Sequence, residues 1–210
     1  MRVRAWRWGR VGRRWRVVER SCCPSVRTRL TATLTAPSRA EAQPTARPAP
    51  AGVGKTCAMR ITLPSGTPAE IDTSQPSPSM GLVIAPDIWS LRPLYDDMVA
   101  RFAREWNMAV CAVEPFPNRD LPPEIEPRMA AVASLDDASH LRDLHEAADA
   151  VGTARVGLMG FCMGGMYCFK SVTSPRFARI ASFYGMIRVP ANWRSASQGE
   201  PLDALARGDA

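Results

Sequence analysis

One cysteine in this sequence stands where a nucleophile would be expected. Cys162 follows the apolar run Val156–Met159 and lies between Gly160 and Gly164 in the pattern G-x-C-x-G. That pattern is typical of a nucleophile elbow, a tight turn from a strand into a helix that holds the nucleophile in a strained backbone conformation. Flanking glycines remove the crowding of side chains against strand and helix. At a helix start, the dipole and the free N–H groups favour a thiolate and can hold an oxyanion.

A buried, inert cysteine is the alternative interpretation, since free cysteine is often found in protein cores. The strand pattern before Cys162, the potentially helical segment Met166–Val172 after it and the additional Gly165 favour the elbow. The other cysteines show neither metal-ligand spacing nor a disulfide framework: Cys22, Cys23, Cys57, Cys111 and Cys168. This usage favours a reducing compartment, and we expect a cytoplasmic protein.

The segments around Cys162 alternate between strand and helix patterns. Short apolar or alternating runs predict strands at Arg60–Leu63, Ala69–Thr73, Met80–Ala85, Ala109–Val113, Arg155–Met159 and Ile180–Tyr184. Helical periodicity predicts helices over about 92–106 and 136–150, with Leu94, Met98 and Phe102 as the buried stripe of the first. The Pro-rich segment 114–127 is expected to be an irregular loop. This alternation indicates an α/β fold, with a mostly parallel sheet and helices on both faces.

The positive charge of the chain is concentrated in its first 58 residues. These hold 13 basic and 2 acidic residues, whereas residues 59–210 hold 14 basic and 18 acidic ones. Because the segment is rich in Arg, Pro and Ala and has no helical or strand period, we expect a disordered basic arm over 1–58. A folded domain is expected over 59–190 and a polar tail over 191–210. No apolar run approaches the length of a membrane span, so no membrane partner is expected.

The basic arm leaves several interpretations open. It lacks the apolar region of a secretory signal, but its Arg-rich, acid-poor composition also fits an organelle transit peptide. Tryptophans among the arginines fit a nucleic-acid or membrane-surface arm, and we expect no nucleic-acid binding beyond the arm itself. A clean strand pattern begins at Met59, which favours a non-native extension before an internal start.

With these elements in order, residues from about Met59 to Gly185 resemble the dienelactone hydrolase family. The most specific pieces of the resemblance are Gly160–Gly165, Val83–Trp89 and Ala181–Gly185. The resemblance implies an α/β-hydrolase fold and hydrolysis of a small-molecule carboxylic ester or lactone through a Cys–His–Asp triad. It implies no cofactor and no metal.

The resemblance also assigns roles to individual residues. Cys162 matches the family nucleophile, and the backbone N–H groups of Met163 and Ile88 would form the oxyanion hole. In the family, an acidic residue before the second donor holds the resting cysteine. Asp87 stands there, although the family usually has the longer glutamate. Arg128 lies in the region of the arginines that bind a substrate carboxylate, and a solvated helix-end charge is the alternative.

The motifs that carry the resemblance do not include a catalytic base. A thiol with a pKa of about 8.5 is mostly unionised at pH 7 and needs a base or a strong local field. The two histidines, His140 and His145, precede Cys162, whereas in this fold acid and histidine follow the nucleophile. They should point about 140° apart on a helix, which excludes a metal pair on one face, and we expect solvated histidines.

The last strands of the family, which carry the catalytic Asp and His, have no counterpart in the 25 residues after Gly185. We therefore expect a C-terminally truncated member of the family with impaired hydrolysis. The alternative from another functional class is a non-catalytic remnant or binding protein that keeps the α/β-hydrolase fold.

Overall fold

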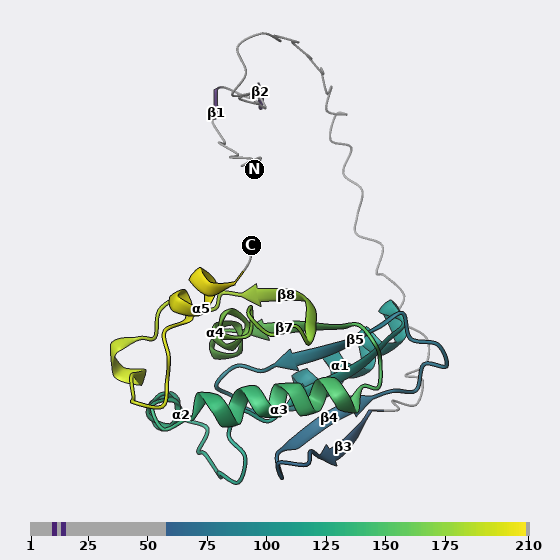
Figure 1. Cartoon of the computed structure of the whole chain (residues 1–210), viewed down its shortest axis with the longest axis horizontal. Helices are drawn as coiled ribbons and strands as arrows, with labels where there is room; N and C mark the ends of the chain where they lie inside the picture. Colours follow the sequence, from purple (N-terminus) through teal and green to yellow (C-terminus); the bar gives the residue numbers. More distant parts are fainter. Residues whose placement is uncertain (1–9, 12–13, 16–57, 209–210) are drawn as a thin grey trace, which may run out of the picture. The chain divides into compact units, whose positions relative to one another are not determined.

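The computed structural model describes residues 10–11, 14–15 and 58–208 (Figure 1). The chain divides into two units, Met1–Ala49 and Pro50–Ala210. In the first unit, strand β1 (Arg10–Val11) pairs antiparallel with β2 (Arg14–Trp15). Apart from these two strands and residue 58, the predicted disordered arm over 1–58 lies outside the described residues.

The second unit is built on a six-stranded sheet with the order β3-β4-β6-β5-β7-β8 (Figure 1). Its strands are β3 (Met59–Thr62), β4 (Pro68–Asp72), β5 (Met80–Ala85), β6 (Met108–Val113), β7 (Val156–Phe161) and β8 (Phe177–Phe183). The pairs β3–β4 and β4–β6 are antiparallel, and the pairs β6–β5, β5–β7 and β7–β8 are parallel. The predicted α/β fold with a mostly parallel sheet is confirmed.

Helices pack against both faces of this sheet. They are α1 (Pro93–Trp106), α2 (Ile125–Val132), α3 (Asp137–Ala150), α4 (Met163–Lys170) and α5 (Pro201–Arg207), with a short 3₁₀ turn η1 (Ala191–Trp193). Successive side chains of a strand point to opposite faces. In β5, Leu82 and Ile84 accordingly pack with α1, whereas Val83 and Ala85 pack with α3 and α4. This two-sided burial explains the near-continuous apolar run of the strand.

The predicted buried stripe of α1 is right in part, since Met98 and Phe102 are partly buried and pack against the core. Leu94 is 49% exposed, and the buried residues are Tyr95, Val99, Ala100 and Ala103. Small alanines let the helix approach the sheet closely. The Tyr95 hydroxyl accepts a hydrogen bond from the N–H of Asp87 at 2.9 Å, which satisfies its polar end in the core.

Two further segments differ from the sequence-based expectation. The segment 114–127 ends in helix, because α2 begins at Ile125 and takes Pro127 into its first turn, where the missing N–H costs nothing. The expected polar tail, 191–210, contains η1 and α5 and buries Trp193 and Ala204.

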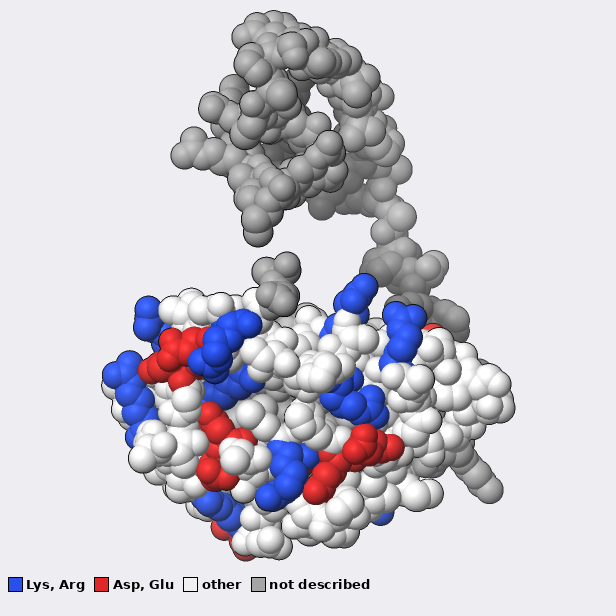
Figure 2. Space-filling model, viewed as in Figure 1, with Lys and Arg blue, Asp and Glu red and all other residues white. Residues whose placement is uncertain are grey.

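Charges on the second unit are mixed in sign. On the face shown in Figure 2, Lys and Arg side chains are interspersed with Asp and Glu, and no continuous patch of one sign covers that described face. Within the residues that the structure describes, no helix is long and apolar enough to cross a membrane.

Candidate active site

Cys162 lies in the turn between β7 and α4, in a strained backbone conformation. Its φ of 54° and ψ of −117° are rarely adopted by a residue with a side chain. Such a conformation persists only where the surroundings impose it. Here the N–H of Cys162 donates to the carbonyl of Phe183 at 3.0 Å, and the N–H of Met166 donates to the carbonyl of Cys162 at 3.0 Å.

Glycines allow the strand, the turn and the helix to pack this closely. A Cβ at Gly164 would lie less than 3.0 Å from the carbonyl oxygens of Ala85 and Pro86, a separation that real Cβ atoms essentially never show. A Cβ at Gly160 would meet the backbone of Gly164 in the same way. The start of α4 therefore rests directly on the end of β5, and the loop that follows β5 lies beside Cys162.

The thiol of Cys162 is half-buried, and its surroundings do not favour a thiolate. Burial raises the pKa of Cys162, the backbone N–H of Met163 lowers it in part, and the negative charge of Asp87 raises it further. The sequence led us to expect that the start of α4 would favour the charged form. In the structure, desolvation outweighs that contribution.

The loop after β5 holds the second candidate oxyanion donor, the N–H of the buried Ile88. Neighbouring N–H groups are bound by side chains: Asp87 N–H to Tyr95, Trp89 N–H to Asp87 and Leu91 N–H to Glu114, each at 2.9 Å. The N–H of Ile88 donates to no group in the described part of the chain. An anionic oxygen could therefore accept a hydrogen bond from it.

Asp87 is paired with an arginine that the sequence reasoning missed. Arg92 Nη1 and Nη2 donate to the two carboxylate oxygens of Asp87 at 2.6 and 2.9 Å, and this pairing is the main cause that raises the pKa of Arg92. The signal in the sequence was a cation directly before Pro93, which begins α1. Within the described residues, no hydrogen bond joins Asp87 to Cys162. Its role in holding the resting thiol stays a prediction.

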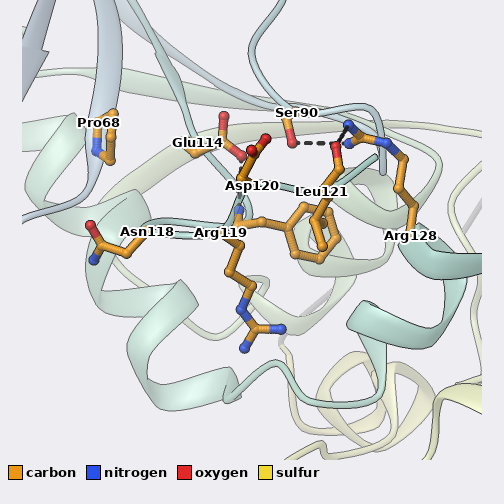
Figure 3. Close-up of a pocket in the computed structure, with 9 residues that line it drawn as sticks. Pro68, Ser90, Glu114, Asn118, Arg119, Asp120, Leu121 and Arg128 are labelled. Atoms are coloured by element: carbon orange, nitrogen blue, oxygen red, sulfur yellow. Dashed lines mark hydrogen bonds between the residues drawn. The ribbon is translucent and has the colours of Figure 1, made fainter. Parts of the chain in front are cut away.

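Arg128, on α2, is not a solvated charge. Its guanidinium donates to the backbone carbonyls of Ile88 and Pro122 at 3.0 and 2.8 Å. It also donates to the carbonyl of Leu121 at 2.8 Å and to the Ser90 hydroxyl at 3.3 Å (Figure 3). It also lies over the ring of Trp89, 5.4 Å from the ring centre. The alternative of a solvated helix-end charge is thus wrong, because backbone carbonyls surround the group.

A hollow of about 600 Å³ opens beside Arg128 (Figure 3). Its lining residues are Pro68, Ser90, Glu114, Phe116, Asn118, Arg119, Asp120, Leu121 and Arg128. Cys162 is not among them. The hollow and Cys162 are therefore separate features. Arg128 lines the hollow and also contacts the loop after β5, which lies beside Cys162.

Neither histidine faces the cysteine. His140 is buried on α3 with its ring 4.0 Å from that of Tyr167, and burial together with Lys170 lowers the pKa of His140 to about 4. The prediction of a solvated His140 is wrong, because it shares the buried face of α3 with Leu144. His145 Nε2 and the Ser174 hydroxyl form a hydrogen bond of 2.9 Å.

Three aromatic residues at the ends of β7 and β8 lie against one another and were not predicted as part of the site. Phe161 stacks on Phe183 with ring centres 5.1 Å apart and lies 6.3 Å from the ring of Tyr184. Tyr184 is 71% exposed and has a positive φ of 43°. Burial raises the pKa of Tyr184, and the charges of Asp87 and Cys162 add to the increase. These rings thus lie at the carboxyl ends of β7 and β8, and Phe161 directly precedes Cys162 in the chain.

Solved structures similar to this chain share the fold of its second unit. One is a candidate dienelactone hydrolase from Klebsiella pneumoniae, with a TM-score of 0.61 and 22% identity over 70% of this chain and 66% of that one. Another is a dienelactone hydrolase-like promiscuous phosphotriesterase from metagenomic libraries, with a TM-score of 0.50 and 20% identity over 64% of this chain and 62% of that one. At this identity, the likeness shows the fold alone.

Sequence comparison gives the family. A "Probable 2-oxo-3-(5-oxofuran-2-ylidene)propanoate lactonase" from Bradyrhizobium sp is 30% identical over 96 residues, which are 40% of this chain and 37% of that protein. The chain thus spans little more than a third of this curated relative. The profile of the Dienelactone hydrolase family matches residues 68–204. This match covers more than half of the sequence, and the chain belongs to the dienelactone hydrolase family.

Proposed function

We propose that this chain hydrolyses a carboxylic ester or lactone, with Cys162 as the nucleophile. The observation that carries the proposal is the strained conformation of Cys162 at the start of α4, held by the hydrogen bond that the N–H of Cys162 donates to the carbonyl of Phe183. A strained residue between a strand and a helix is typical of a nucleophile elbow and supports this role. The name of the relative from Bradyrhizobium supports a lactone as one form of the substrate.

In the proposed reaction, the sulfur of Cys162 attacks the acyl carbon and forms a C–S bond. The negative charge that develops on the carbonyl oxygen is stabilised by the N–H groups of Met163 and Ile88. The C–O bond to the leaving oxygen then breaks, and this oxygen takes up a proton equivalent to the one lost by the thiol. Water hydrolyses the thioester, which releases the acid and restores the thiol. No cofactor is needed for these steps.

The proposed reaction is slow in this chain, because the described residues place no base beside the nucleophile. The only two histidines in the sequence contact Tyr167 and Ser174. The raised pKa of Cys162 further reduces the thiolate fraction at pH 7. Acylation of Cys162 should therefore limit the rate. A reducing, cytoplasmic location is part of the proposal, since Cys111, Cys162 and Cys168 are free thiols.

The second candidate function is non-catalytic binding by the same fold. The raised pKa of Cys162 and the pairing of Asp87 with Arg92 favour it, because both leave the thiol without activation. The two functions differ in what Cys162 does. A hydrolase requires an acyl-enzyme at this residue, whereas a binding protein does not.

The deciding experiment uses p-nitrophenyl acetate with the full chain and its Cys162→Ala and Cys111→Ala variants. We expect release of p-nitrophenolate above background, one acetyl group on Cys162 by mass spectrometry, and loss of both in Cys162→Ala. The Cys111→Ala variant is the control, because Cys111 is buried in β6 and burial raises its pKa to about 12. Equal rates for the unaltered chain and Cys162→Ala would contradict the hydrolase proposal and leave binding as the function.

A further inference from the structure

The guanidinium of Arg128 connects two loops through nearly all of its donors. Nε donates to Pro122 O, Nη1 to both Ile88 O and Ser90 Oγ, and Nη2 to Leu121 O. Four of the five N–H donors of an arginine are therefore occupied. A bidentate contact with a carboxylate needs two parallel free donors. Arg128 cannot offer such a pair without breaking a contact that it makes to the protein.

The contact of Arg128 with Ile88 O fixes a peptide unit next to the candidate oxyanion donor. The peptide that joins Ile88 to Trp89 is planar, so its C=O and N–H move together. Arg128 holds the C=O at 3.0 Å, and the carboxylate of Asp87 holds the N–H at 2.9 Å. On the other side, the hydroxyl of Tyr95 holds the N–H of Asp87.

The peptide unit between Asp87 and Ile88 thus lies between two units that side chains hold in place. This middle unit carries the N–H of Ile88, which has no acceptor among the described residues. Its direction is set by the fixed neighbours. Donors that stabilise a transition state are effective because they are oriented before the reaction begins.

We propose that Arg128 is a positioning residue that orients the N–H of Ile88 toward the developing oxyanion, rather than a ligand for a substrate carboxylate. A positioning role of this kind rests on the proposed function, since it requires an acyl transfer at Cys162. The ring of Trp89 under the guanidinium adds a further contact that keeps the side chain over the loop.

The test compares the unaltered chain with Arg128→Gln and Arg128→Lys in acylation of Cys162 by two esters. One ester, p-nitrophenyl acetate, is neutral, and the other, p-nitrophenyl hemisuccinate, carries a carboxylate. Removal of a whole oxyanion donor slows such reactions about 100-fold or more, so we expect misorientation to slow both esters about tenfold and by the same factor. Lysine should not restore the rate, because one ammonium cannot bond four acceptors in two loops.

Alkylation of Cys162 by iodoacetamide serves as a second readout, because it forms no oxyanion. We expect the same alkylation rate in all variants. Arg119→Gln is the matched control, since Arg119 lines the same hollow but donates to Ser134 and the carbonyl of Ala131. It should react like the unaltered chain. Slowing of the hemisuccinate alone would make Arg128 a substrate ligand and overturn the inference. Equal slowing of alkylation would overturn it too, by showing general damage to the site.

Hydrogen exchange at residues 86–92 separates failure of the inference from failure of the proposed function. We expect faster exchange of the Trp89 N–H in Arg128→Gln than in Arg119→Gln. Unchanged exchange would overturn the positioning role even if both esters react. If the unaltered chain shows no acylation that depends on Cys162, the proposed function itself fails, and the positioning role in catalysis fails with it.

Discussion

The two ends of α4 carry polar groups that serve different purposes. At its start, Cys162 is half-buried, strained and free of any contact with a histidine. At its end, Lys170 is buried and donates to both carboxylate oxygens of Asp137 at 2.7 and 2.9 Å. Between them, the ring of Tyr167 contacts that of His140, with the ring centres 4.0 Å apart. One helix thus presents a candidate nucleophile at one end and an ion pair in the core at the other.

The comparison shows that the side chains able to exchange protons contact other core residues and not Cys162. His140 and Lys170 have perturbed pKa values, which often mark a catalytic site. Here burial is the largest cause of both shifts, and the groups join α3 to α4. About 12 Å of helix rise separates the Cα atoms of Cys162 and Lys170. Asp137 also accepts the N–H of Gly199 at 2.8 Å, so the same pair anchors the segment before α5.

The largest effect is expected from the buried ion pair. Lys170→Met should lower the free energy of unfolding by about 3 kcal/mol, because it leaves the carboxylate of Asp137 partly buried without its cation. Urea denaturation measures this. Arg101→Met on α1 is the matched control, since its partners Asp97 and Glu105 are exposed, and it should cost less than about 1 kcal/mol. Similar losses of unfolding free energy in the two variants would mean that the buried ion pair of Lys170 stabilises the fold no more than an exposed pair does.

The next effect is a dependence of stability on pH. The pKa of His140 is about 4 in the folded chain and about 6.5 in the unfolded one, so the unfolded state binds more protons between these values. The contribution of neutral His140 is therefore fully present above pH 6.5 and is lost as the pH falls toward 4. The total loss is up to about 3 kcal/mol.

The variant His140→Phe tests this pH dependence because it keeps an aromatic ring against Tyr167. Urea denaturation at a series of pH values between 4 and 7 should show that the loss of stability on acidification is smaller than in the unaltered chain. His145→Phe serves as the matched control, because it replaces the other histidine of α3 with the same side chain. If His140→Phe loses as much stability as the unaltered chain, another group must cause the loss, and His140 would not be buried as a neutral ring.

Much of the fold could be predicted because its signals are local. The apolar run of β5 is continuous since both faces are covered, and the glycines beside Cys162 are required by the close packing of α4 on β5. The most deeply buried positions of α1 could not be predicted in this way. Whether Tyr95 or Leu94 is buried depends on the N–H of Asp87, a partner that only the folded chain brings to the tyrosine hydroxyl.

The candidate site, like α1, depends on contacts that the sequence alone does not show. The elbow motif pointed to Cys162, and the family resemblance pointed to Met163 and Ile88. It did not show that Arg92 binds Asp87 or that Arg128 binds the carbonyl of Ile88, because these contacts join segments that have no common pattern. His140 was misplaced for a related reason. A histidine is usually solvated, and its burial here follows from the position of Tyr167 on a different helix.

The smallest effect is expected at the start of α4, at Cys162. Asp87→Asn should make Cys162 react with iodoacetamide about threefold faster at pH 7, because it removes a negative charge that raises the pKa of the thiol. Asparagine can still accept the N–H of Trp89, so the loop keeps this contact. The freed guanidinium of Arg92 acts in the same direction. Labelling rates followed by mass spectrometry measure the change, and Asp97→Asn on the exposed face of α1 is the control.

A slower reaction of Asp87→Asn would reverse the interpretation of this end of α4. It would mean that the carboxylate of Asp87 takes the proton of the thiol, as a base in contact with Cys162, despite its pairing with Arg92. A faster reaction would instead show that the start of α4 lacks a base and that burial keeps the thiol protonated. The difference between the two ends of the helix would then be one of solvent access, since at both ends burial is the largest cause of the shift in pKa.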